Sequence, residues 1–509
     1  MSARTPFRAE RFTQTFLAEE FAGGELAGRF RWARGLGWLS WDGRRWAVCP
    51  EETVVERARQ WAKRKLGEAS HSIRTGRSEA LQEVKAWLAV ARTAAGLRAI
   101  VSLARGIDGV ITDAAVFDAH PDLLNAGNGV VDLRTGELSP PDPTLLLTKL
   151  APVDYHPDAT HPDWTAALQA IPEDVRAWYQ VRLGQSTTGH MTPDDVLVVQ
   201  QGGGENGKTT VLGAVEKTLG DYAVLVSDKV ILADPRAHST ERMELRGARF
   251  ALVEETPEAR RLSVSLLKKV LGTPTMTARY IRQDEMRWEA THSLWLSTNY
   301  LPLVEETDHG TWRRLLALRF PYTYVKPPAV PAHEMERPAD PTLRDRVRGG
   351  RDKQHEAVLA WLVTGAVAWY ATRREMPPPP RRVVADTHAW RIETDLILAY
   401  LGERLVFASG AHVMATDLLD DFNAWLARHG HRVWSDKVFS SRFGGHHEVT
   451  RNHVEKGRPR GSAGLSRPPV RSTVVPIQPV PERYNAWLGV EFARESHTPA
   501  DQGKTVTWD

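Results

Sequence analysis

The stretch of residues 202–209, GGGENGKT, is the feature that most restricts how this chain can fold. It fits the pattern G-x-x-x-x-G-K-[ST], whose glycines allow a tight loop with backbone N–H groups around a phosphate. An apolar run, residues 196–199, precedes the loop, and a helix-like pattern follows it. A strand, a glycine-rich loop and a helix in this order predict an α/β domain with an anion site at the helix N-terminus.

This motif predicts a bound nucleotide and Mg²⁺, and the family resemblance described below implies that the nucleotide is ATP. The candidate nucleotide-binding residues are Gly202, Gly203, Gly204, Glu205, Asn206, Gly207, Lys208, Thr209 and Thr210. Lys208 would reach the β- and γ-phosphates, and the Thr209 hydroxyl would ligate Mg²⁺. The alternative, a glycine-rich hairpin that binds nothing, is disfavoured because a strand precedes the loop and a helix follows it.

Polar residues also follow two further apolar, strand-like runs. Residues 250–253 lead directly into Glu254 and Glu255, and residues 293–298 lead into Asn299. One carboxylate at a strand end can bind Mg²⁺ while another deprotonates the attacking water, so we assign the metal to Glu254 and the base to Glu255. Asn299 would touch the γ-phosphate. Taken alone, the acids indicate a solvated edge and the Asn a turn; the loop upstream favours the catalytic interpretation.

Composition limits the remaining possibilities. The chain has 66 Lys plus Arg against 63 Asp plus Glu, so any nucleic-acid-binding surface must be regional. Cys49 is the one cysteine, which rules out an intrachain disulfide and a cysteine-paired zinc site. The N-terminus lacks a signal-peptide pattern, and the apolar run at residues 358–371 is shorter than the roughly 20 residues that span a bilayer. We expect a cytoplasmic protein with no membrane partner and read that run as a buried helix.

At 509 residues the chain should form several domains. Residues 1–150 read as a mainly helical N-terminal accessory domain with a hairpin at Asp42-Gly43, and residues 151–325 as an α/β core around a parallel sheet, with a helical collar at about 160–190. Residues 326–382 contain two proline clusters and read as a linker with a helical block. Residues 383–509 predict a winged-helix-like domain.

The order of loop, acid pair and Asn resembles the superfamily-three helicases. More closely, the chain from about Gly35 to Tyr324 resembles the poxvirus, phage and plasmid primase-helicase family. The resemblance is carried by GLGWLSWDGRRW, LLNAGNGVVDLRTGEL, GGGENGKTT, RGARFALVEET, KKVLGTPTMTARYIRQDEMRWEATHSLWLSTNYLP and TDHGTWRRLLALRFPY. It implies an AAA+-like ATPase, a hexameric homo-oligomer that moves on single-stranded DNA, 3′ to 5′, in replication of a phage, plasmid or other mobile element. A phage-encoded copy would act in the host cytoplasm.

The resemblance also assigns roles to arginines. Arg314, or as second choice Arg313, would reach into the ATP site of a neighbouring subunit; the alternative is a solvated pair at a strand start. A hairpin between the acid strand and the Asn strand would line the ring channel and contact phosphates of single-stranded DNA through Arg279, Arg282 and Arg287.

Many members of that family carry a primer-synthesising domain before the helicase. The few residues before Gly35 hold no Asp-x-Asp plus His constellation. We therefore expect the helicase part alone, with a separate primase or polymerase as a candidate partner.

The C-terminal region is rich in Lys and Arg between residues 428 and 471. A helix beginning near Ser435 would present Lys437 and Arg442 to fork or origin duplex DNA. The alternative is a solvated basic surface. For the whole chain, two rival functions remain: an ATP-switched DNA-binding replication initiator that does not unwind DNA, and a P-loop phosphotransferase.

Overall fold

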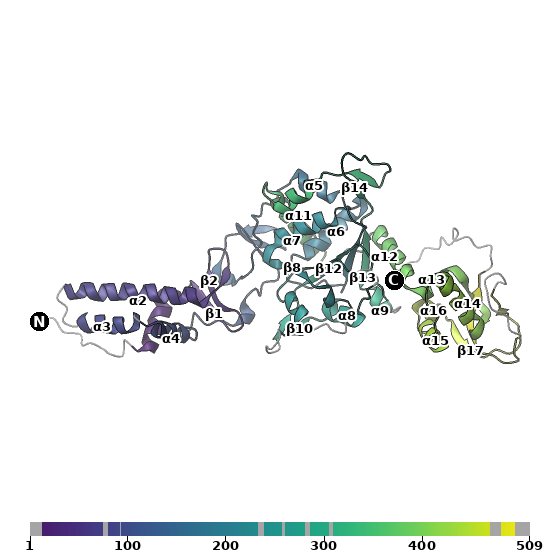
Figure 1. Cartoon of the computed structure of the whole chain (residues 1–509), viewed down its shortest axis with the longest axis horizontal. Coiled ribbons are helices and arrows are strands. Elements are labelled where there is room, and N and C mark those ends of the chain that lie inside the picture. Colours follow the sequence, from purple (N-terminus) through teal and green to yellow (C-terminus); the bar gives the residue numbers. More distant parts are fainter. Residues whose placement is uncertain are drawn as a thin grey trace.

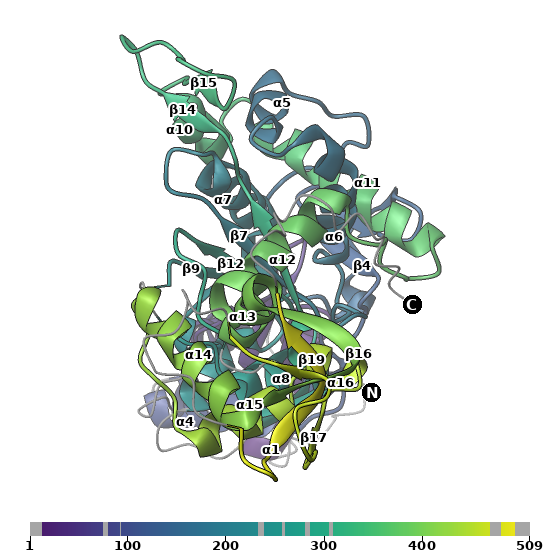
Figure 2. The same ribbon diagram turned by 90° about the vertical axis from the view of Figure 1, so that its right-hand side faces the viewer.

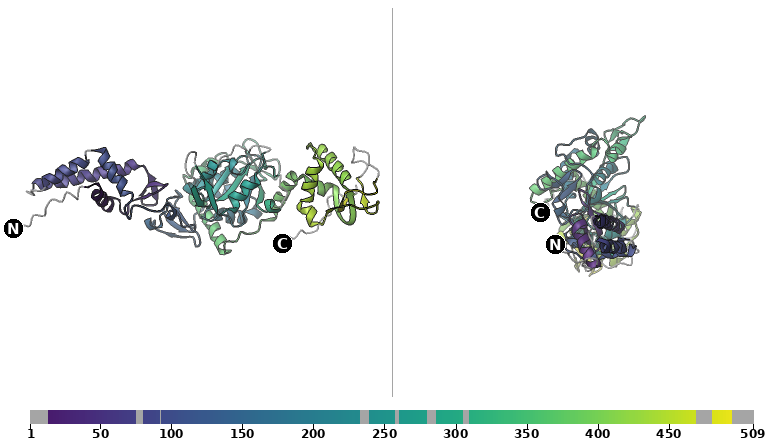
Figure 3. Two further views of the ribbon diagram at one scale, coloured as in Figure 1. Left: turned by 90° about the horizontal axis from the view of Figure 1, so that it is seen from below. Right: turned by 90° about the vertical axis from the view of Figure 1, so that its left-hand side faces the viewer.

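The structure is a computed structural model that describes residues 13–74, 80–91, 93–232, 239–256, 260–279, 286–304, 309–468 and 480–493. Figure 1 shows an N-terminal helical unit, a central α/β body and a C-terminal unit arranged in a row. The same row is seen from below in Figure 3. In the end-on view of Figure 2 the C-terminal unit faces the reader.

The N-terminal unit joins helices to a small sheet. Its elements are α1 (Gln14–Phe21), the π-helix Ala22–Leu26, β1 (Phe30–Ala33), β2 (Gly37–Trp41), β3 (Trp46–Cys49), α2 (Glu51–Arg74), α3 (Ala80–Ala91) and α4 (Ala94–Ala104). The hairpin predicted at Asp42-Gly43 is confirmed, because β2 and β3 pair antiparallel across it. There the Asp42 carboxylate accepts backbone hydrogen bonds from Arg44 and Arg45, both at 2.8 Å. Local side-chain acceptors of this kind stabilise a tight turn.

A three-stranded meander, β4 (Leu123–Ala126), β5 (Gly129–Asp132) and β6 (Glu137–Ser139), follows. Leu124 and Val131 are fully buried in the same apolar core as the central sheet. The sequence predicted a domain boundary at residue 150. Because the meander packs on the central body, that body begins earlier in the chain.

The parallel sheet predicted for the core is confirmed. It has five strands in the order β13-β7-β12-β9-β8, and all four neighbouring pairs are parallel. The strands are β7 (Leu197–Gln201), β8 (Ala223–Val226), β9 (Phe250–Glu254), β12 (Ser293–Thr298) and β13 (Leu315–Arg319).

Side chains alternate between the two faces of this sheet. Val198 and Trp295 belong to a core that includes residues of α6, α7 and α11, whereas Val199 and Leu296 belong to a second core that includes residues of α8. The elements around the sheet are α5 (Pro162–Leu168), α6 (Glu173–Gln185), α7 (Lys208–Leu219), α8 (Val264–Gly272), β10 (Thr275–Ala278), β11 (Met286–Glu289), α9 (His309–Trp312), β14 (Thr323–Val325), β15 (Glu336–Pro338), α10 (Leu343–Gly349), α11 (Gln354–Ala371) and α12 (Arg381–Thr394). The apolar run at residues 358–371 lies in α11, with most of its large side chains buried, as predicted.

Among the described residues no single helix is long and apolar enough to cross a membrane; Leu81–Ala89 and Ala94–Ala104, bent by 85° at their junction, pass that test only as a pair.

Helix α12 covers the free edge of β13. The Thr387 hydroxyl accepts a hydrogen bond from the Ala317 N–H, and the Asp386 carboxylate accepts one from the Arg319 N–H, each at 2.9 Å. Exposed N–H groups of an edge strand are a template for unwanted pairing, and α12 occupies two of them. The boundary predicted at residue 383 thus falls within a helix that packs on the central body.

The C-terminal unit follows directly. It contains α13 (Leu396–Arg404), β16 (Leu405–Met414), α14 (Ala415–Arg428), α15 (Asp436–Gly444), α16 (His447–Arg451), β17 (Glu455–Gly457), β18 (Leu465–Ser466) and β19 (Ala486–Phe492), with sheet order β17-β19-β16-β18. As predicted, α15 begins after Ser435, whose side chain accepts from the Val438 N–H. Asp395 joins this unit to α12, because its carboxylate caps α13 at Leu398 and lies 3.0 Å from His446 Nε2.

Candidate active site

The sheet order brings the polar strand ends together. Strand β12 lies between β7 and β9, with Thr298 opposite Gln201 and Ser297 opposite Glu254. Because all three strands are parallel, the glycine-rich loop, Asn299 and the two glutamates meet at one edge. Ligands of open parallel sheets bind at this carboxyl edge.

Two glycines of the loop have no room for a side chain. A Cβ at Gly202 would lie 2.0 Å from Asn206 Nδ2, and one at Gly207 would lie 2.6 Å from the Cβ of Ala170. Gly207 also has a φ of 84°, which glycine adopts without strain. Gly203 and Gly204 by contrast face open space, with no atom within 4 Å of an added Cβ. The loop is therefore tightly packed against the protein at Gly202 and Gly207 and open at Gly203 and Gly204, where a ligand would lie.

Lys208 is the first residue of α7, and only 4% of its surface is exposed. Its Nζ donates to the Gly202 carbonyl at 2.6 Å and to Asn299 Oδ1 at 3.4 Å. Burial lowers the pKa of Lys208 to about 8, and the charge of Glu255 opposes this shift. Both hydrogen-bond acceptors found for the ammonium group in the described chain are neutral, and an arriving anion would stabilise its charged form.

Several hydrogen-bond donors of the loop have no acceptor within the described part of the chain. Asn206 Nδ2 is buried and has no hydrogen-bond acceptor. Within the described part of the chain, the backbone N–H groups of residues 203–207 donate to no protein acceptor either. A buried donor without a partner, such as Asn206 Nδ2, is rare and costly, and the N–H groups of the exposed residues 203–205 are open to a ligand. A ligand rich in acceptor oxygens therefore fits this loop. The residues present thus fit the phosphates of ATP.

The acidic pair ends β9. Both glutamates are exposed, and the Glu255 N–H donates to the Ser297 carbonyl at 2.8 Å. Glu255 has a φ of 53°, a left-handed conformation that is uncommon outside glycine. In the described residues no three His, Cys, Asp or Glu side chains are grouped to hold a metal. Mg²⁺ typically takes one or two protein carboxylates together with substrate phosphates and water, so the exposed hydroxyl of Thr209 and Glu254 fit that ion.

Two threonines that the sequence analysis missed link the acid strand to the Asn strand. The hydroxyls of Thr256 and Thr298 are buried and lie 2.8 Å apart. Thr298 also bonds the Tyr300 carbonyl at 2.9 Å, and Gln201 Nε2 donates to the Asn299 carbonyl at 3.2 Å. These bonds fix the turn that carries Asn299. Only the strand register pairs the two threonines, so no local pattern could have found them.

Glu205 within the loop is held from outside the sheet. Its carbonyl accepts from the Tyr324 N–H at 2.8 Å, and its carboxylate lies 2.5 Å from Lys326 Nζ. Strand β14, which projects from the body beside β15 in Figure 2, therefore anchors the middle of the loop.

Arg313 and Arg314 lie at the other edge of the sheet. The Arg314 carbonyl accepts from the N–H of Leu197, the first residue of β7, at 2.8 Å. The five residues of β7 separate this point from the glycine-rich loop, a span of roughly 16 Å. The structure thus does not bring these arginines to the candidate site of their own chain.

The candidate DNA-binding residues lie elsewhere. Arg279 and Arg287 are exposed at the β10–β11 pair, and Arg282 lies outside the described residues. Lys437 and Arg442 are exposed on α15, where the Arg442 guanidinium lies 5.0 Å from the centroid of the Trp434 ring.

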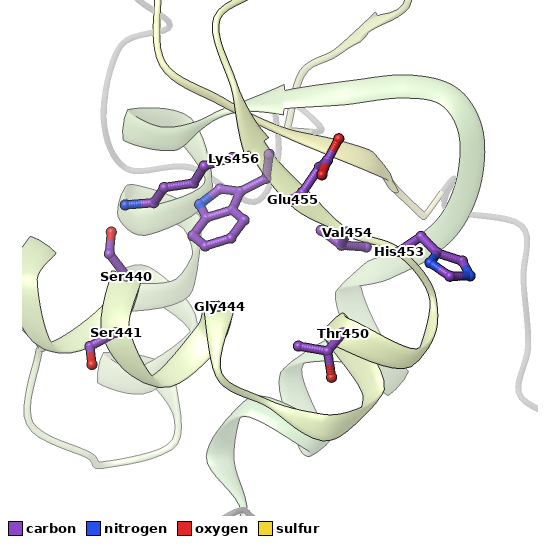
Figure 4. Close-up of a pocket in the computed structure, with 9 residues that line it drawn as sticks. Ser440, Ser441, Gly444, Thr450, His453, Val454, Glu455 and Lys456 are labelled. Carbon is purple, nitrogen blue, oxygen red and sulfur yellow. The ribbon is translucent and has the colours of Figure 1, made fainter.

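A hollow of about 840 Å³ lies beside α15. Figure 4 shows hydroxyls from α15 and α16 around it. It is lined by Ser440, Ser441, Gly444, Thr450, His453, Val454, Glu455, Lys456 and Trp487. The hollow belongs to the C-terminal unit and contains none of the predicted catalytic residues.

Comparison with known proteins relates the chain to viral replication proteins. Residues 9–172 match the family model described as D5 N terminal like. "Putative primase C962R" of African swine fever virus (strain Badajoz 1971 Vero-adapted) is 27% identical over 318 residues, 58% of this chain and 32% of that protein. "Putative helicase 022R" of Frog virus 3 (isolate Goorha) is 23% identical over 386 residues, 61% of this chain and 39% of that protein. The chain thus spans about a third of the length of these relatives.

A solved structure is also similar to this chain over much of its length. The apo C-terminal region of NrS-1 in its A form is 10% identical, with a TM-score of 0.41, and the match covers 77% of this chain and 89% of that one.

Proposed function

We propose that this chain is an ATP-dependent DNA helicase that acts in the replication of a phage, plasmid or other mobile element. One observation carries the proposal: the donor-rich glycine loop, the Lys208–Asn299 pair and the acidic pair occupy the carboxyl edge of one parallel sheet. The viral relatives named primase and helicase support it. The direct test is ATP hydrolysis by the whole chain with and without single-stranded DNA, with Lys208→Ala as the inactive control.

Each residue at this edge has a chemical role in the proposal. The N–H groups of residues 203–207 and the Lys208 ammonium bind the phosphates, and Lys208 exchanges its neutral acceptors for phosphate oxygens. Thr209 and Glu254 hold Mg²⁺, which when bound neutralises phosphate charge. Glu255 takes the proton of the attacking water. Asn299, already bonded to Lys208, contacts the γ-phosphate and signals whether it is present.

The position of the arginine pair supports a ring. Because Arg313 and Arg314 lie at the edge opposite the nucleotide loop, an arginine of this pair that contacts a nucleotide contacts one bound to another copy. Rotational symmetry gives every site such a neighbour, and a homohexamer is the ring we propose.

DNA contacts complete the proposal. The β10–β11 pair carries exposed Arg279 and Arg287. In the proposal these two arginines, and Arg282 between them in the sequence, bind phosphates of single-stranded DNA during 3′ to 5′ movement. In the proposal the C-terminal unit, with the order α13, β16, α14, α15, α16, β17, β18, β19, acts like a winged helix, and α15 places Lys437 and Arg442 against fork or origin duplex DNA. A separate primase or polymerase would supply primers in the cytoplasm.

A second candidate is an ATP-switched DNA-binding initiator that does not unwind DNA. The exposed basic side chains of α15 favour it, because they suit duplex DNA whether or not the chain moves along a strand. The two functions differ in strand displacement, which only the helicase catalyses. A phosphotransferase is disfavoured because the Asn strand and an arginine pair away from the nucleotide edge suit a contact between copies better than an acceptor pocket.

A further inference from the structure

One carboxylate, that of Asp195, holds both arginines of the proposed ring contact. Its Oδ2 lies 3.3 Å from Arg314 Nη2 and 3.6 Å from Arg313 Nη2. Asp195 stands two residues before β7, and the arginines stand directly before β13, the strand that pairs with β7. The main chains on both sides of this contact are therefore fixed by the sheet.

The two arginines differ in how far they are available to a partner. The Arg314 side chain is 13% exposed and also donates to the Gly310 carbonyl at 2.5 Å. The Arg313 side chain is 45% exposed, and its one ion pair among the described residues is the longer contact to Asp195. Arg314 is thus committed within its own chain, whereas the Arg313 guanidinium has one longer contact through Nη2 and stays largely open to a partner.

The backbone at Asp195 supports a dedicated role. Its φ is 56°, in the left-handed region that few non-glycine residues adopt. The preceding Asp194 directs its carboxylate to a different arginine, Arg182, with one contact at 3.1 Å. Local strain that surrounding contacts maintain is often found at functional positions. The twist between these two aspartates lets each serve a separate arginine.

Positive charge exceeds negative charge in the cluster of Asp195, Arg313 and Arg314. Two guanidinium groups share one carboxylate, so the cluster of Asp195, Arg313 and Arg314 has a net positive charge. Among the ion pairs of the described residues, Asp195 is the acid that contacts either arginine. The remaining charge is carried by the more exposed member, Arg313.

We propose that Arg313 is the arginine that contacts the nucleotide phosphates of a neighbouring copy, that Asp195 is its positioning residue, and that Arg314 is an internal brace. This inference rests on the proposed ATPase function and reverses the ranking of the two arginines made from the sequence. Asp195 acts through Arg313 and touches no substrate itself.

Subunit mixing tests the assignment. Arg313→Ala should reduce ATP turnover on the order of 10³-fold or more, the range known for arginines acting in trans. Asp195→Asn keeps the arginine but loosens it, and we expect a fall in kcat of roughly 10- to 100-fold with little change in KM. Mixing Asp195→Asn with Lys208→Ala should restore activity, because some junctions then join an intact loop to a well-held arginine. Mixing Asp195→Asn with Arg313→Ala should not.

Restored ATP turnover in the mixed rings distinguishes a positioning role of Asp195 from a folding role. If Asp195→Asn only misfolded, Lys208→Ala and Arg313→Ala would have the same effect on it. Asp174→Asn is the matched control: it removes an exposed ion pair, 3.2 Å from Arg382, and should leave turnover unchanged. Arg313→Ala changes an exposed side chain, so this variant should fold. It therefore still tests the assignment of Arg313 if Asp195→Asn does not assemble.

The outcomes separate this inference from the function it rests on. If Lys208→Ala hydrolyses ATP as fast as wild type, the proposed ATPase site is wrong and the inference falls with it. If Lys208→Ala is inactive while Arg313→Ala keeps wild-type turnover, the inference alone is overturned. Equal restoration of Asp195→Asn by both partners would also overturn it.

Discussion

Lys208 Nζ and Asn299 Oδ1 lie 3.4 Å apart, although the two residues follow different strands and are 91 positions apart in the chain. The contact joins the residue proposed to bind phosphate to the residue proposed to report on it. A phosphate entering the loop would compete for the Lys208 ammonium and release the Asn299 amide. Asn299 would then be free to face the nucleotide.

The protonation of Lys208 makes nucleotide affinity pH-dependent. In the free protein burial lowers its pKa to about 8, while a bound phosphate favours the charged form. Affinity is therefore at its full value below about pH 8 and is lost as pH rises through it, so ATP should bind about tenfold more weakly at pH 9 than at pH 7. Lys208→Arg stays protonated throughout and should lose this dependence. Calorimetry across this range measures both; parallel profiles for the two proteins would refute the role of Lys208.

Substitution of Glu254 and of Glu255 should have different effects on ATP hydrolysis. Glu255→Gln cannot accept a proton, so turnover should fall about 10²- to 10⁴-fold while ATP stays bound. Glu254→Gln should instead raise the Mg²⁺ concentration needed for half-maximal hydrolysis. A Mg²⁺ titration of both variants checks the division. If the Mg²⁺ requirement moves with Glu255 and not with Glu254, the roles are exchanged.

Trp390 should anchor α12 to the central body. Its side chain is fully buried, packs edge-to-face on Trp312 and donates through Nε1 to the Pro302 carbonyl at 3.0 Å. Trp390→Ala should lower the free energy of unfolding of the central body by about 3–5 kcal/mol. Denaturant unfolding followed by loss of ATP binding measures it. Ile392→Ala, an exposed change on the same helix, should cost less than about 0.5 kcal/mol, and equal effects would contradict the anchor.

The α15 surface should contribute to duplex binding through charge. If Lys437 and Arg442 each neutralise one phosphate, the double alanine variant should reduce the log–log salt slope of duplex affinity by about 1.8 units. Fluorescence anisotropy over a salt series measures the slope. Lys63→Ala, exposed on α2, is the control and should leave it unchanged. An unchanged slope in the double variant would make α15 a solvated surface.

Local pattern predicted the strands and the loop well, and it predicted α12 poorly. The apolar runs that became β7, β9 and β12 stand out because a strand buried on both faces is almost continuously apolar. Helix α12 follows a proline cluster that favoured a linker, and its contacts to β13 come from Asp386 and Thr387. Side chains that act as acceptors for a distant edge strand have no signature in the sequence.

The same distinction applies to the site. Glu254 and Asn299 could be predicted because parallel strands share an edge, so residues at their carboxyl ends converge whatever their order. The pairing of Asp195 with Arg314 could not, because 119 positions separate them and only the register of β13 on β7 brings them together. From the sequence, Arg314 is therefore preferred to Arg313 as the arginine that contacts a neighbouring subunit. The difference in burial between the two side chains becomes visible only in the structure.

Strand displacement tests the central claim most directly. The whole chain should be given 3′-tailed and 5′-tailed duplexes, with ATP and without, beside Lys208→Ala. We expect displacement of the 3′-tailed duplex with ATP, little displacement of the 5′-tailed one, and none by Lys208→Ala. ATP-dependent binding of both duplexes without any displacement would contradict a helicase and leave the initiator as the function of this chain.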